Sequence, residues 1–371
     1  MLPGMNVSSS KRIAIIGGGV AGLGTAWRLA QAGAAVTVYE SGALPARSGA
    51  ATWASGGMLC ARLEMGHAPA ALAAFASSAR AAWPAFAAEI ERASGVSPGF
   101  AETGALVTAS GHAPGDDIVA VDGDEARRLV PGLSAHIRAA LWAAEEARAD
   151  PRWLAIGLAR AAQAAGARFV KEVRVNRIVE NAGRVTGVLT SAGVQAADHV
   201  VLAAGAWSGG LLKVSNLPGP PIRPVKGQML SLAADPRAMP VNRLIWAEGA
   251  YIVPHHDGRV VIGATQEEAG FDATLSEGAL EALRQAAVAT LPALAGLPVA
   301  ERFCGFRPAT DDGLPALGGI GPEGLTLASG QFRNGILFAP LIADAAALHA
   351  LEGRLPSIAR QFSAARFAEA A

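Results

Sequence analysis

Residues 12–40 have the sequence RIAIIGGGVAGLGTAWRLAQAGAAVTVYE, and the order of its parts sets the class of fold. An isoleucine-rich run ends at Ile16, three glycines follow, and an alanine- and leucine-rich helical pattern extends to Ala32. A second apolar run leads to Glu40. Strand, glycine turn, helix and strand in this order are typical of a βαβ unit, from which parallel sheets are built. The sequence therefore predicts an α/β protein.

Three of the glycines in this stretch match the pattern G-x-G-x-x-G, namely Gly17, Gly19 and Gly22. The first permits a tight turn, the second lets a pyrophosphate approach the backbone, and the third allows close packing of the helix. Phosphates then lie at a helix N-terminus. Glu40 follows eighteen residues after Gly22, where a carboxylate can accept hydrogen bonds from an adenosine ribose. The pattern predicts an adenine dinucleotide site rather than a purely structural turn.

A second match to the same pattern serves as a control. Residues 319–324, GIGPEG, contain a proline and join two short apolar runs instead of opening a helix, so we interpret them as a turn. With one dinucleotide motif, the chain shows no separate site for a nicotinamide cosubstrate. Residues 52–59, TWASGGML, are mostly small and apolar, which suits backbone packed against a flat ring. FAD is therefore favoured over NAD.

Size, charge and cysteine usage narrow the class of protein. A chain of 371 residues exceeds the size at which single cores stop growing, which favours two domains. Lysine plus arginine equals aspartate plus glutamate, at 31 each, so the charge does not indicate a nucleic-acid partner. Cys60 and Cys304 lie far apart without a CxxC or Cys/His cluster, and we expect neither a metal site nor a disulfide framework.

The start of the chain and its most apolar stretch bear on location. Residues 1–11 are polar and serine-rich and lack the basic-then-apolar order of a secretory signal. The apolar stretch 325–351 is interrupted by Arg333, Asn334 and Asp344, which makes it too polar to span a bilayer. We therefore expect a cytoplasmic protein without a transmembrane segment.

The order of the predicted elements indicates two interleaved domains. Strand 199–203 is apolar throughout and suits a parallel strand buried beside the first sheet, whereas residues 223–263 contain short strands with polar turns, typical of an antiparallel sheet. We predict a Rossmann-type FAD-binding domain interleaved with an α+β substrate domain built on that antiparallel sheet. The FAD-binding domain comprises residues 11–80, 150–215 and 300–365, and the substrate domain comprises residues 81–149 and 216–299.

Five segments carry a family resemblance that extends over nearly the whole chain. They are residues 17–40, ASGGML at 54–59, YIVP at 251–254, GFRPATDDGLP at 305–315 and FRNGI at 332–336. Together they resemble the D-amino-acid oxidase superfamily of flavoproteins, and within it the glycine oxidases of thiamine biosynthesis. The last three segments are far more specific than the glycine fingerprint alone.

The fingerprint and the resemblance together predict the site residues. The resemblance implies that Tyr251, Arg307 and Arg333 bind and orient the substrate. A guanidinium can pair with a carboxylate through two hydrogen bonds, and a phenol can add another to the same group. The expected cofactor contacts are Gly17, Gly18, Gly19, Val20, Ala21, Gly22, Glu40, Ser41, Ser55, Gly56, Gly57, Met58, Val175, Gly205, Arg333, Asn334, Gly335 and Ile336.

Two positions depart from the glycine oxidase pattern. Gln331 stands where those enzymes have His before the FRNGI segment, and Gln266 stands where they have Met after Gly-Ala-Thr. Both differences affect the pocket and hence the choice of substrate. Relatives that attach FAD covalently use a cysteine at the position of Gly305, one residue after Cys304, so we predict non-covalent FAD.

Each predicted substrate residue also has a plain structural interpretation. Arg307, before a proline, is from local sequence alone a surface arginine on a turn. Tyr251 is on an alternating strand and could be a core aromatic with its hydroxyl at the edge. Arg333 lies in an apolar stretch, where an unpaired charge is costly, so it needs a partner. That partner is either a substrate carboxylate or a protein carboxylate such as Asp344.

Two further patterns give local predictions. Residues 255–257, His-His-Asp, lie between two predicted strands and before Gly258, so we interpret them as a solvated hairpin tip rather than a catalytic cluster. Residues 68–95 are alanine-rich and contain Pro84, which predicts two helices with a break at the proline.

The resemblance implies the activity. We expect FAD-dependent oxidation of a small amino acid or amine, such as glycine, sarcosine or a small D-amino acid, to an oxo acid, ammonia or an amine, and hydrogen peroxide. Oxygen is the expected electron acceptor. The sequence allows a homo-oligomer and leaves the oligomeric state open. Two alternatives stay open: a dehydrogenase that passes electrons to a quinone or a partner subunit, and a flavin-binding subunit without turnover.

Overall fold

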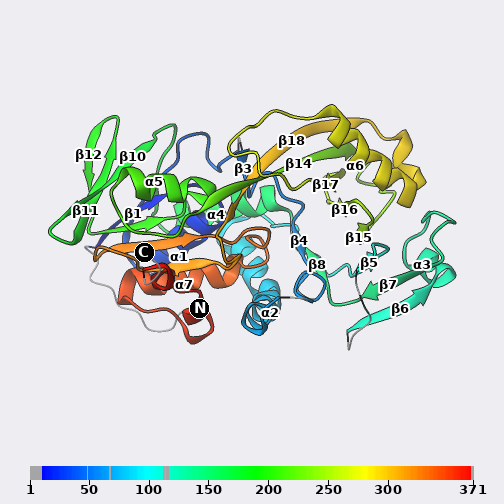
Figure 1. Ribbon diagram of the computed structural model, residues 1–371, viewed down its shortest axis with the longest axis horizontal. Coiled ribbons are helices and arrows are strands. Elements are labelled where there is room, and N and C mark those ends of the chain that lie inside the picture. Colours follow the sequence, from blue (N-terminus) through cyan, green and yellow to red (C-terminus); the bar gives the residue numbers. More distant parts are fainter. Residues whose placement is uncertain (1–10, 48, 67, 112, 114–116, 369–371) are drawn as a thin grey trace.

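The computed structural model describes residues 11–368 except positions 48, 67, 112 and 114–116. Two large sheets lie one after the other along the long axis of the molecule (Figure 1). The predicted α/β class is confirmed. Residues 1–10, on which the expected lack of a leader depends, lie outside the described residues. Within the described ranges, every helix is too short or too polar to span a bilayer.

The first sheet has six strands and is parallel except at one edge. Strand β13 pairs with β1 from Ile13↔His199 to Ile16↔Leu202, so the strand predicted to return to the first sheet does so. The turn predicted at residues 319–324 joins the antiparallel pair β19 and β20. The strands in order are β19 (Ala316–Gly318), β20 (Leu325–Ser329), β13 (His199–Leu202), β1 (Arg12–Ile16), β2 (Ala35–Tyr39) and β9 (Arg168–Val170).

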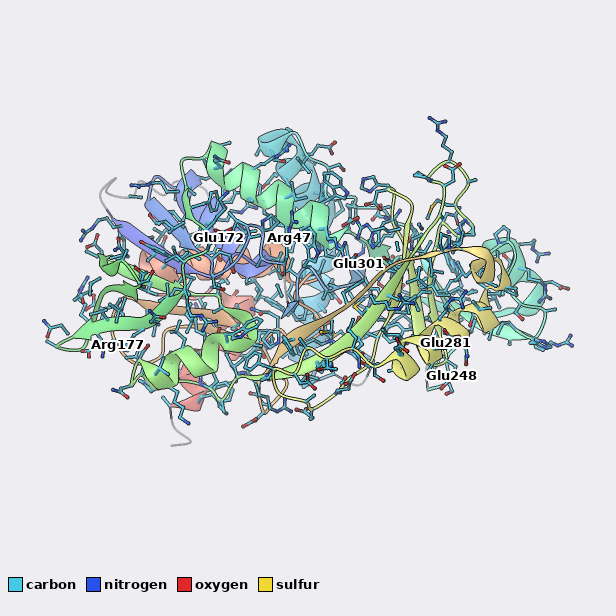
Figure 2. All side chains as sticks on the ribbon, turned by 90° about the horizontal axis from the view of Figure 1, so that it is seen from above. Arg47, Glu172, Arg177, Glu248, Glu281 and Glu301 are labelled. Atoms are coloured by element: carbon cyan, nitrogen blue, oxygen red, sulfur yellow. The ribbon has the colours of Figure 1, made fainter. Side chains whose placement is uncertain are left out.

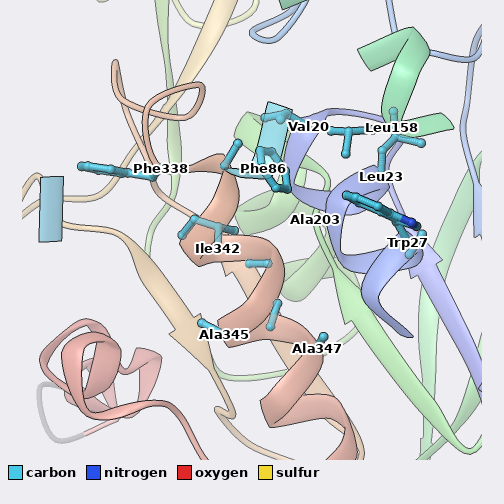
Figure 3. Close-up of a cluster of buried hydrophobic side chains, with 14 of the residues drawn as sticks. Val20, Leu23, Trp27, Phe86, Leu158, Ala203, Phe338, Ile342, Ala345 and Ala347 are labelled. Carbon is cyan, nitrogen blue, oxygen red and sulfur yellow. The ribbon is translucent and has the colours of Figure 1, made fainter. Parts of the chain in front are cut away.

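Both faces of this sheet are covered, as its apolar strands require. One face packs against four helices through a core that includes Val20, Leu23 and Trp27 (Figure 3). The other face packs against a separate three-stranded sheet through residues such as Ile178 and Val188. The helices are α1 (Val20–Gln31), α2 (Ala70–Ser94), α4 (Pro151–Ala164) and α7 (Ala339–Glu352), and the small sheet is β10 (Val175–Asn181), β11 (Arg184–Thr190) and β12 (Gly193–Ala196).

The second large sheet has nine strands and is mostly antiparallel, as predicted for residues 223–263. Two long neighbouring strands, β14 and β18, extend from this sheet toward the first one (Figure 1). The strands in order are β3 (Gly49–Ala50), β18 (Val299–Ala309), β14 (Arg223–Ala233), β17 (Arg259–Gly263), β16 (Ala250–Pro254), β15 (Leu244–Ala247), β5 (Ala105–Val107), β7 (Ala139–Ala143) and β6 (Ile118–Asp122).

The faces of the second sheet have different neighbours. Helix α6 (Glu277–Thr290) covers one face through Leu280, Leu283 and Ala287. The other face packs against the segment that contains Cys60 and Leu63. The remaining elements are β4 (Met58–Leu59), β8 (Ala147–Arg148), α3 (Gly123–Leu129), α5 (Ser208–Val214) and the 3₁₀ helices η1 (Gly205–Trp207), η2 (Pro292–Gly296), η3 (Ser357–Phe362) and η4 (Ala364–Phe367). The domain boundaries stay a prediction.

The expected break at Pro84 is wrong. Helix α2 is continuous from Ala70 to Ser94 with Pro84 inside it and exposed. The residues on either side hold the helix together, because Trp83 and Phe86 are buried in the core at 0% and 2% exposure. The Trp83 indole also donates to the Leu337 carbonyl at 3.0 Å. Tertiary packing therefore outweighs the backbone hydrogen bond that a proline removes.

The predicted hairpin tip at residues 255–257 is only partly correct. A turn does connect β16 to β17, but the His255 side chain is 1% exposed. Its Nδ1 lies 3.4 Å from the Asp150 carboxylate, which is fully buried. Asp150 also accepts hydrogen bonds from Arg259 and from the first amides of α4. We call Asp150, His255 and Arg259 the junction, because it ties α4 to the second sheet.

Candidate active site

A cavity of about 1280 Å³ extends from the β1–α1 turn to the second sheet. Its lining includes every predicted cofactor and substrate residue except Gly22 and Asn334. Gly22 packs behind the turn, and Asn334 lies in a backbone turn whose amide donates to the Gln331 carbonyl. Residues distant in sequence therefore surround one space. Their roles as ligands stay a prediction.

The turn between β1 and α1 leaves no room for side chains at two glycines. Gly17 has a φ of +111°, and a Cβ there would lie 2.4 Å from the Ala203 carbonyl oxygen. A Cβ on Gly22 would lie 2.0 Å from the Gly17 oxygen. At Gly19, by contrast, the nearest atom to a Cβ is the Thr52 hydroxyl at 3.3 Å. The glycines thus allow strand, turn and helix to pack closely beside the cavity.

Helix α1 begins without a side-chain cap on Gly19. The Val20 amide donates to the Thr52 hydroxyl at 3.0 Å. Because the first amides of a helix need acceptors and carry partial positive charge, this end of the cavity suits an anionic group such as a pyrophosphate. Thr52 belongs to the segment 52–59 that was predicted to pack against a flat ring, but the hydrogen bond that its hydroxyl accepts at the start of α1 was not predicted.

Glu40 lies at the end of β2 and is held by backbone amides. Its Oε2 accepts from the Gly18 amide at 2.8 Å, and its Oε1 accepts from the Gly42 amide at 3.0 Å and the Ser41 hydroxyl at 3.1 Å. A carboxylate keeps further lone pairs for the hydroxyls of a ribose. Its position beside the glycine turn is the one that the dinucleotide fingerprint requires.

Two arginines that were not predicted also line the cavity, Arg47 and Arg174. The Val173 amide donates to the Glu40 carbonyl at 3.0 Å, which brings Arg174 to the end of the cavity that contains Glu40. Figure 2 shows Arg47 on the half of the molecule that contains the first sheet, away from Glu248 and Glu281 at the opposite end. The glycine cradle, uncapped helix and added positive charge fit FAD.

The segment from Ser55 to Met58 lines the cavity and packs closely against its protein neighbours. Gly57 has a φ of +78°, and a Cβ there would lie 1.9 Å from the Ala149 carbonyl oxygen. A Cβ on Gly56 would lie 2.8 Å from the Tyr251 ring. Only glycines allow the backbone to run this close to both neighbours. That this backbone packs against a flat ring stays a prediction.

Arg307 and Tyr251 project from the second sheet into the other end of the cavity. Each side chain packs over a glycine on a neighbouring strand. A Cβ on Gly227 would lie 2.4 to 2.6 Å from the Arg307 guanidinium atoms, and a Cβ on Gly263 would lie 2.4 Å from the Tyr251 hydroxyl. These two glycines therefore determine where the two functional groups lie. Neither was predicted as a site residue.

The Arg307 guanidinium is anchored through one of its nitrogens. Nη1 donates to the Lys226 carbonyl at 3.2 Å and to the Thr265 carbonyl at 3.1 Å. Burial lowers the pKa of Arg307, although the reference value for arginine is so high that the group stays charged. A guanidinium held at one nitrogen keeps other donors for a bidentate partner in the cavity. The alternative of a surface arginine does not fit this geometry.

Tyr251 lies beside Arg307 at the same end. Its hydroxyl is 3.7 Å from the Met229 sulfur, a weak acceptor, so the phenol keeps its capacity to bind a ligand. Burial raises the pKa of Tyr251 to about 12, while nearby Arg307 acts in the opposite direction. The phenol is therefore protonated at neutral pH and can donate a hydrogen bond to an anion.

Arg333 has a protein partner, but not the one considered from the sequence. Its Nη2 lies 3.5 Å from Oε2 of Glu64, whereas Asp344 pairs with Arg28 at 2.8 Å. Arg333 is also less buried than its apolar surroundings indicated, because its side chain is 41% exposed. Glu64 lies in the segment between β4 and α2 and was not predicted; nothing in the local sequence marks it.

The two glutamines that depart from the glycine oxidase pattern both line the cavity. Gln331 is 7% exposed, and its Nε2 has no hydrogen-bond partner among the described residues. A buried donor without a partner is costly unless a ligand completes it. Gln331 thus adds a polar contact point to the cavity wall that the sequence did not reveal as a donor.

Neither cysteine is placed to form a bond to a cofactor in the cavity. Cys60 is fully buried, and Cys304 donates toward the Ala273 carbonyl at 3.5 Å. Neither Cys60 nor Cys304 lines the cavity. This supports the prediction of a non-covalently held flavin.

Fold and cavity are those of a dinucleotide-dependent oxidoreductase, with Tyr251 and Arg307 at the end of the cavity opposite the glycine turn. The family described as FAD dependent oxidoreductase (DAO) matches residues 12–348. The chain belongs to this family, so FAD is its cofactor, and the resemblance to the D-amino-acid oxidase superfamily is confirmed.

Similar proteins agree with this assignment. A glycine oxidase of Pseudomonas putida is 35% identical over 342 residues, which covers 89% of this chain and 92% of the relative. Among solved structures, a glycine oxidase from Geobacillus kaustophilus has a TM-score of 0.86 at 29% identity, covering 96% of this chain and 99% of the other. An iminodiacetate oxidase from Chelativorans has a TM-score of 0.85 at 27% identity, covering 95% and 99%.

Proposed function

We propose that this protein oxidises a small amino acid with one carboxylate, such as glycine, sarcosine or a small D-amino acid. For glycine, the substrate reacts with oxygen and water to give glyoxylate, ammonia and hydrogen peroxide. The observation that carries the proposal is the Arg307 guanidinium, which is anchored through one nitrogen beside a protonated Tyr251 in the cavity. The similarity to glycine oxidases supports the same substrate class.

The residues of the chain bind and orient the substrate. When bound, FAD supplies a two-electron acceptor for the C–H bond beside the substrate nitrogen. Arg307 would pair with the substrate carboxylate, and the Tyr251 phenol would donate to the same group. Fixing the carboxylate at two points restricts the position of the α-carbon. Binding the substrate would therefore also orient its reacting C–H bond. We assign no side-chain base, and the amine would react in its neutral form.

The electron acceptor and the setting of the enzyme are further parts of the proposal. We propose oxygen as the acceptor and FAD held without a covalent bond. A dehydrogenase that passes electrons to a quinone or partner subunit is the nearest alternative. The cytoplasmic location stays a prediction, and the oligomeric state stays open.

The test uses the purified yellow protein. Glycine, sarcosine and D-alanine are each added first without air, to measure flavin bleaching, and then with air, to measure peroxide. Bleaching with peroxide release is the expected result. Bleaching without peroxide release would indicate a dehydrogenase instead of an oxidase. A flavin that no amine bleaches would contradict the proposal and favour a subunit without turnover.

A second substrate class comes from one of the similar structures. The Chelativorans enzyme is an iminodiacetate oxidase by name, and iminodiacetate carries two carboxylates. The pocket of this chain contains two arginines, which at first sight suits such a substrate. Glu64 also lines this end of the cavity and lies 3.5 Å from Arg333, so it bears on whether a second carboxylate can bind.

A further inference from the structure

Glu64 is the acidic residue that faces the substrate end of the cavity. It lines the cavity together with Tyr251, Arg307 and Arg333, and its side chain is 11% exposed. Its Oε2 lies 3.5 Å from Nη2 of Arg333 and has no hydrogen-bond partner among the described residues. A buried carboxylate with an incomplete set of partners is costly, so its presence in a ligand pocket calls for an explanation.

The charges around Glu64 fall into two groups. Burial raises the pKa of Glu64 above its usual value, and Arg333 and Arg307 offset this only in part. Arg333 is the arginine that forms an ion pair with Glu64, at 3.5 Å. Arg307 instead bonds to two backbone carbonyls and keeps its positive charge for a ligand. Among the described residues, the substrate end therefore holds one ion pair, Glu64 with Arg333, and a second cation, Arg307, whose hydrogen bonds go to backbone carbonyls.

The position of Glu64 is fixed by its neighbours. Glu146, which is 1% exposed, accepts hydrogen bonds at one oxygen from the Arg62 amide and the Leu63 amide, both at 2.9 Å. The Glu64 amide itself donates to the Cys60 carbonyl at 3.0 Å. The backbone on both sides of Leu63 is therefore held in place, which keeps Glu64 at the wall of the cavity.

Building on the proposed function, we propose that Glu64 is a specificity-determining residue that admits substrates with one carboxylate and excludes those with two. A single carboxylate pairs with Arg307. A second carboxylate would reach the side of the pocket where Arg333 is already paired, and it would face Glu64, a group of the same charge. Leaving a charge unpaired in a buried site is a strong basis for rejection.

Sarcosine and iminodiacetate form a matched pair for the test. Both are secondary amines that carry a carboxymethyl group on nitrogen. The second substituent is a methyl group in sarcosine and another carboxymethyl group in iminodiacetate. Methoxyacetate and oxydiacetate repeat this difference with oxygen in place of the nitrogen, so they bind without reacting. Titrations of the flavin absorbance with these two ethers measure the dissociation constants of the holoenzyme without turnover.

The wild-type protein gives the first result. We expect methoxyacetate to bind at least about tenfold more tightly than oxydiacetate. A tenfold difference in affinity corresponds to about 1.4 kcal/mol of binding free energy, and leaving a buried charge unpaired costs more than that. Sarcosine should exceed iminodiacetate in kcat/KM by a similar factor. Equal affinity for both ethers in the wild-type protein would overturn the inference without any variant.

Glu64→Gln gives the second result. It removes the charge with little change of shape and frees Arg333, so the affinity ratio of methoxyacetate to oxydiacetate should fall at least about tenfold. Glu64→Asp keeps the charge and should keep the wild-type preference. The control is Glu268→Gln, which removes the same charge from a side chain that is 62% exposed and pairs with Arg223 at the surface. It should leave the ratio unchanged.

The outcomes separate this inference from the proposed function. If sarcosine bleaches the flavin but Glu64→Gln keeps the wild-type ratio with intact flavin, Glu64 does not set specificity and the function stands. If methoxyacetate does not bind and no amine bleaches the flavin, the proposed function is wrong. If Glu268→Gln shifts the ratio as much as Glu64→Gln, the effect is one of overall charge and the inference fails.

Discussion

The two ends of the cavity are built by different means. At the first sheet, the turn from Gly17 to Gly22, Glu40 and the start of α1 present mainly backbone amides, within one short stretch of sequence. At the second sheet, Tyr251 and Arg307 present side chains, from strands that are distant in sequence. The glycine turn of the cofactor end is therefore local and depends on the path of the backbone, whereas the substrate end depends on tertiary structure.

Because the two ends are built differently, they tolerate different substitutions. A backbone site fails when a side chain is added, because the amides lose their approach to the ligand. A side-chain site fails when a functional group is removed or displaced, because charge and orientation are lost. The predictions below test whether cofactor binding and substrate binding can be lost independently.

The largest effect is expected for Gly22→Ala. The added Cβ would lie 2.0 Å from the Gly17 carbonyl oxygen, so the turn must open and the α1 amides move away from the cofactor. We expect the variant to be purified without flavin, as measured by the absence of yellow absorbance and of FAD in a denatured extract. The control is Gly278→Ala on α6, where a Cβ meets nothing within 4 Å. A yellow Gly22→Ala protein would contradict the backbone interpretation.

The next effect is expected for Arg307→Met. Removing one partner of a buried charge pair costs about 2 to 5 kcal/mol, or roughly thirty- to several-thousand-fold in kcat/KM. FAD content should not change, because Arg307 lies at the substrate end. The exposed Arg302 on the same strand provides the control Arg302→Met, which should leave kcat/KM unchanged. Loss of flavin together with activity would show that the two ends are not independent.

A smaller effect is expected for Gly227→Ala. The new Cβ would lie within 2.4 to 2.6 Å of the Arg307 guanidinium, which must move while keeping its charge. A displacement of about 1 Å can lower the rate up to a hundredfold. We expect lower kcat/KM with normal flavin content, measured by bleaching with glycine without air. Gly296→Ala, with nothing within 4 Å of its Cβ, should behave like the wild-type protein.

The smallest effect is expected for Tyr251→Phe, which removes one hydrogen bond to a charged group. Such a bond contributes about 1.5 kcal/mol, so kcat/KM should fall roughly tenfold. Since the pKa of Tyr251 is about 12, the phenol is protonated below that pH, and the ratio of variant to wild type should stay constant from neutral to mildly alkaline pH. A ratio that changes through neutral pH would mean that the phenol titrates there.

The same difference explains what the sequence could predict. The βαβ unit around Gly17, Gly22 and Glu40 follows from local periodicity and spacing, because its parts are neighbours in the chain. Tyr251 and Arg307 were predicted only through the family resemblance, since no local pattern relates one strand to another. Gly17, Glu40, Tyr251 and Arg307 line the cavity, and Gly22 packs behind the glycine turn.

The missed residues act through partners that the sequence does not identify. Gly227 and Gly263 are ordinary strand glycines until the structure places Arg307 and Tyr251 over them. Glu64 resembles any loop glutamate until it faces Arg333. Pro84 misled the prediction because the buried residues around it keep the helix continuous.

The junction formed by Asp150, His255 and Arg259 has a consequence for how the protein unfolds. Separating the two sheets would leave the Asp150 charge unpaired, so both sheets should melt in one cooperative transition. Burial lowers the pKa of His255 to about 4 from 6.5, so the unfolded chain binds the proton first as the pH falls. The melting temperature should therefore fall as the pH is lowered from 6.5 toward about 4, and the two sheets should unfold together.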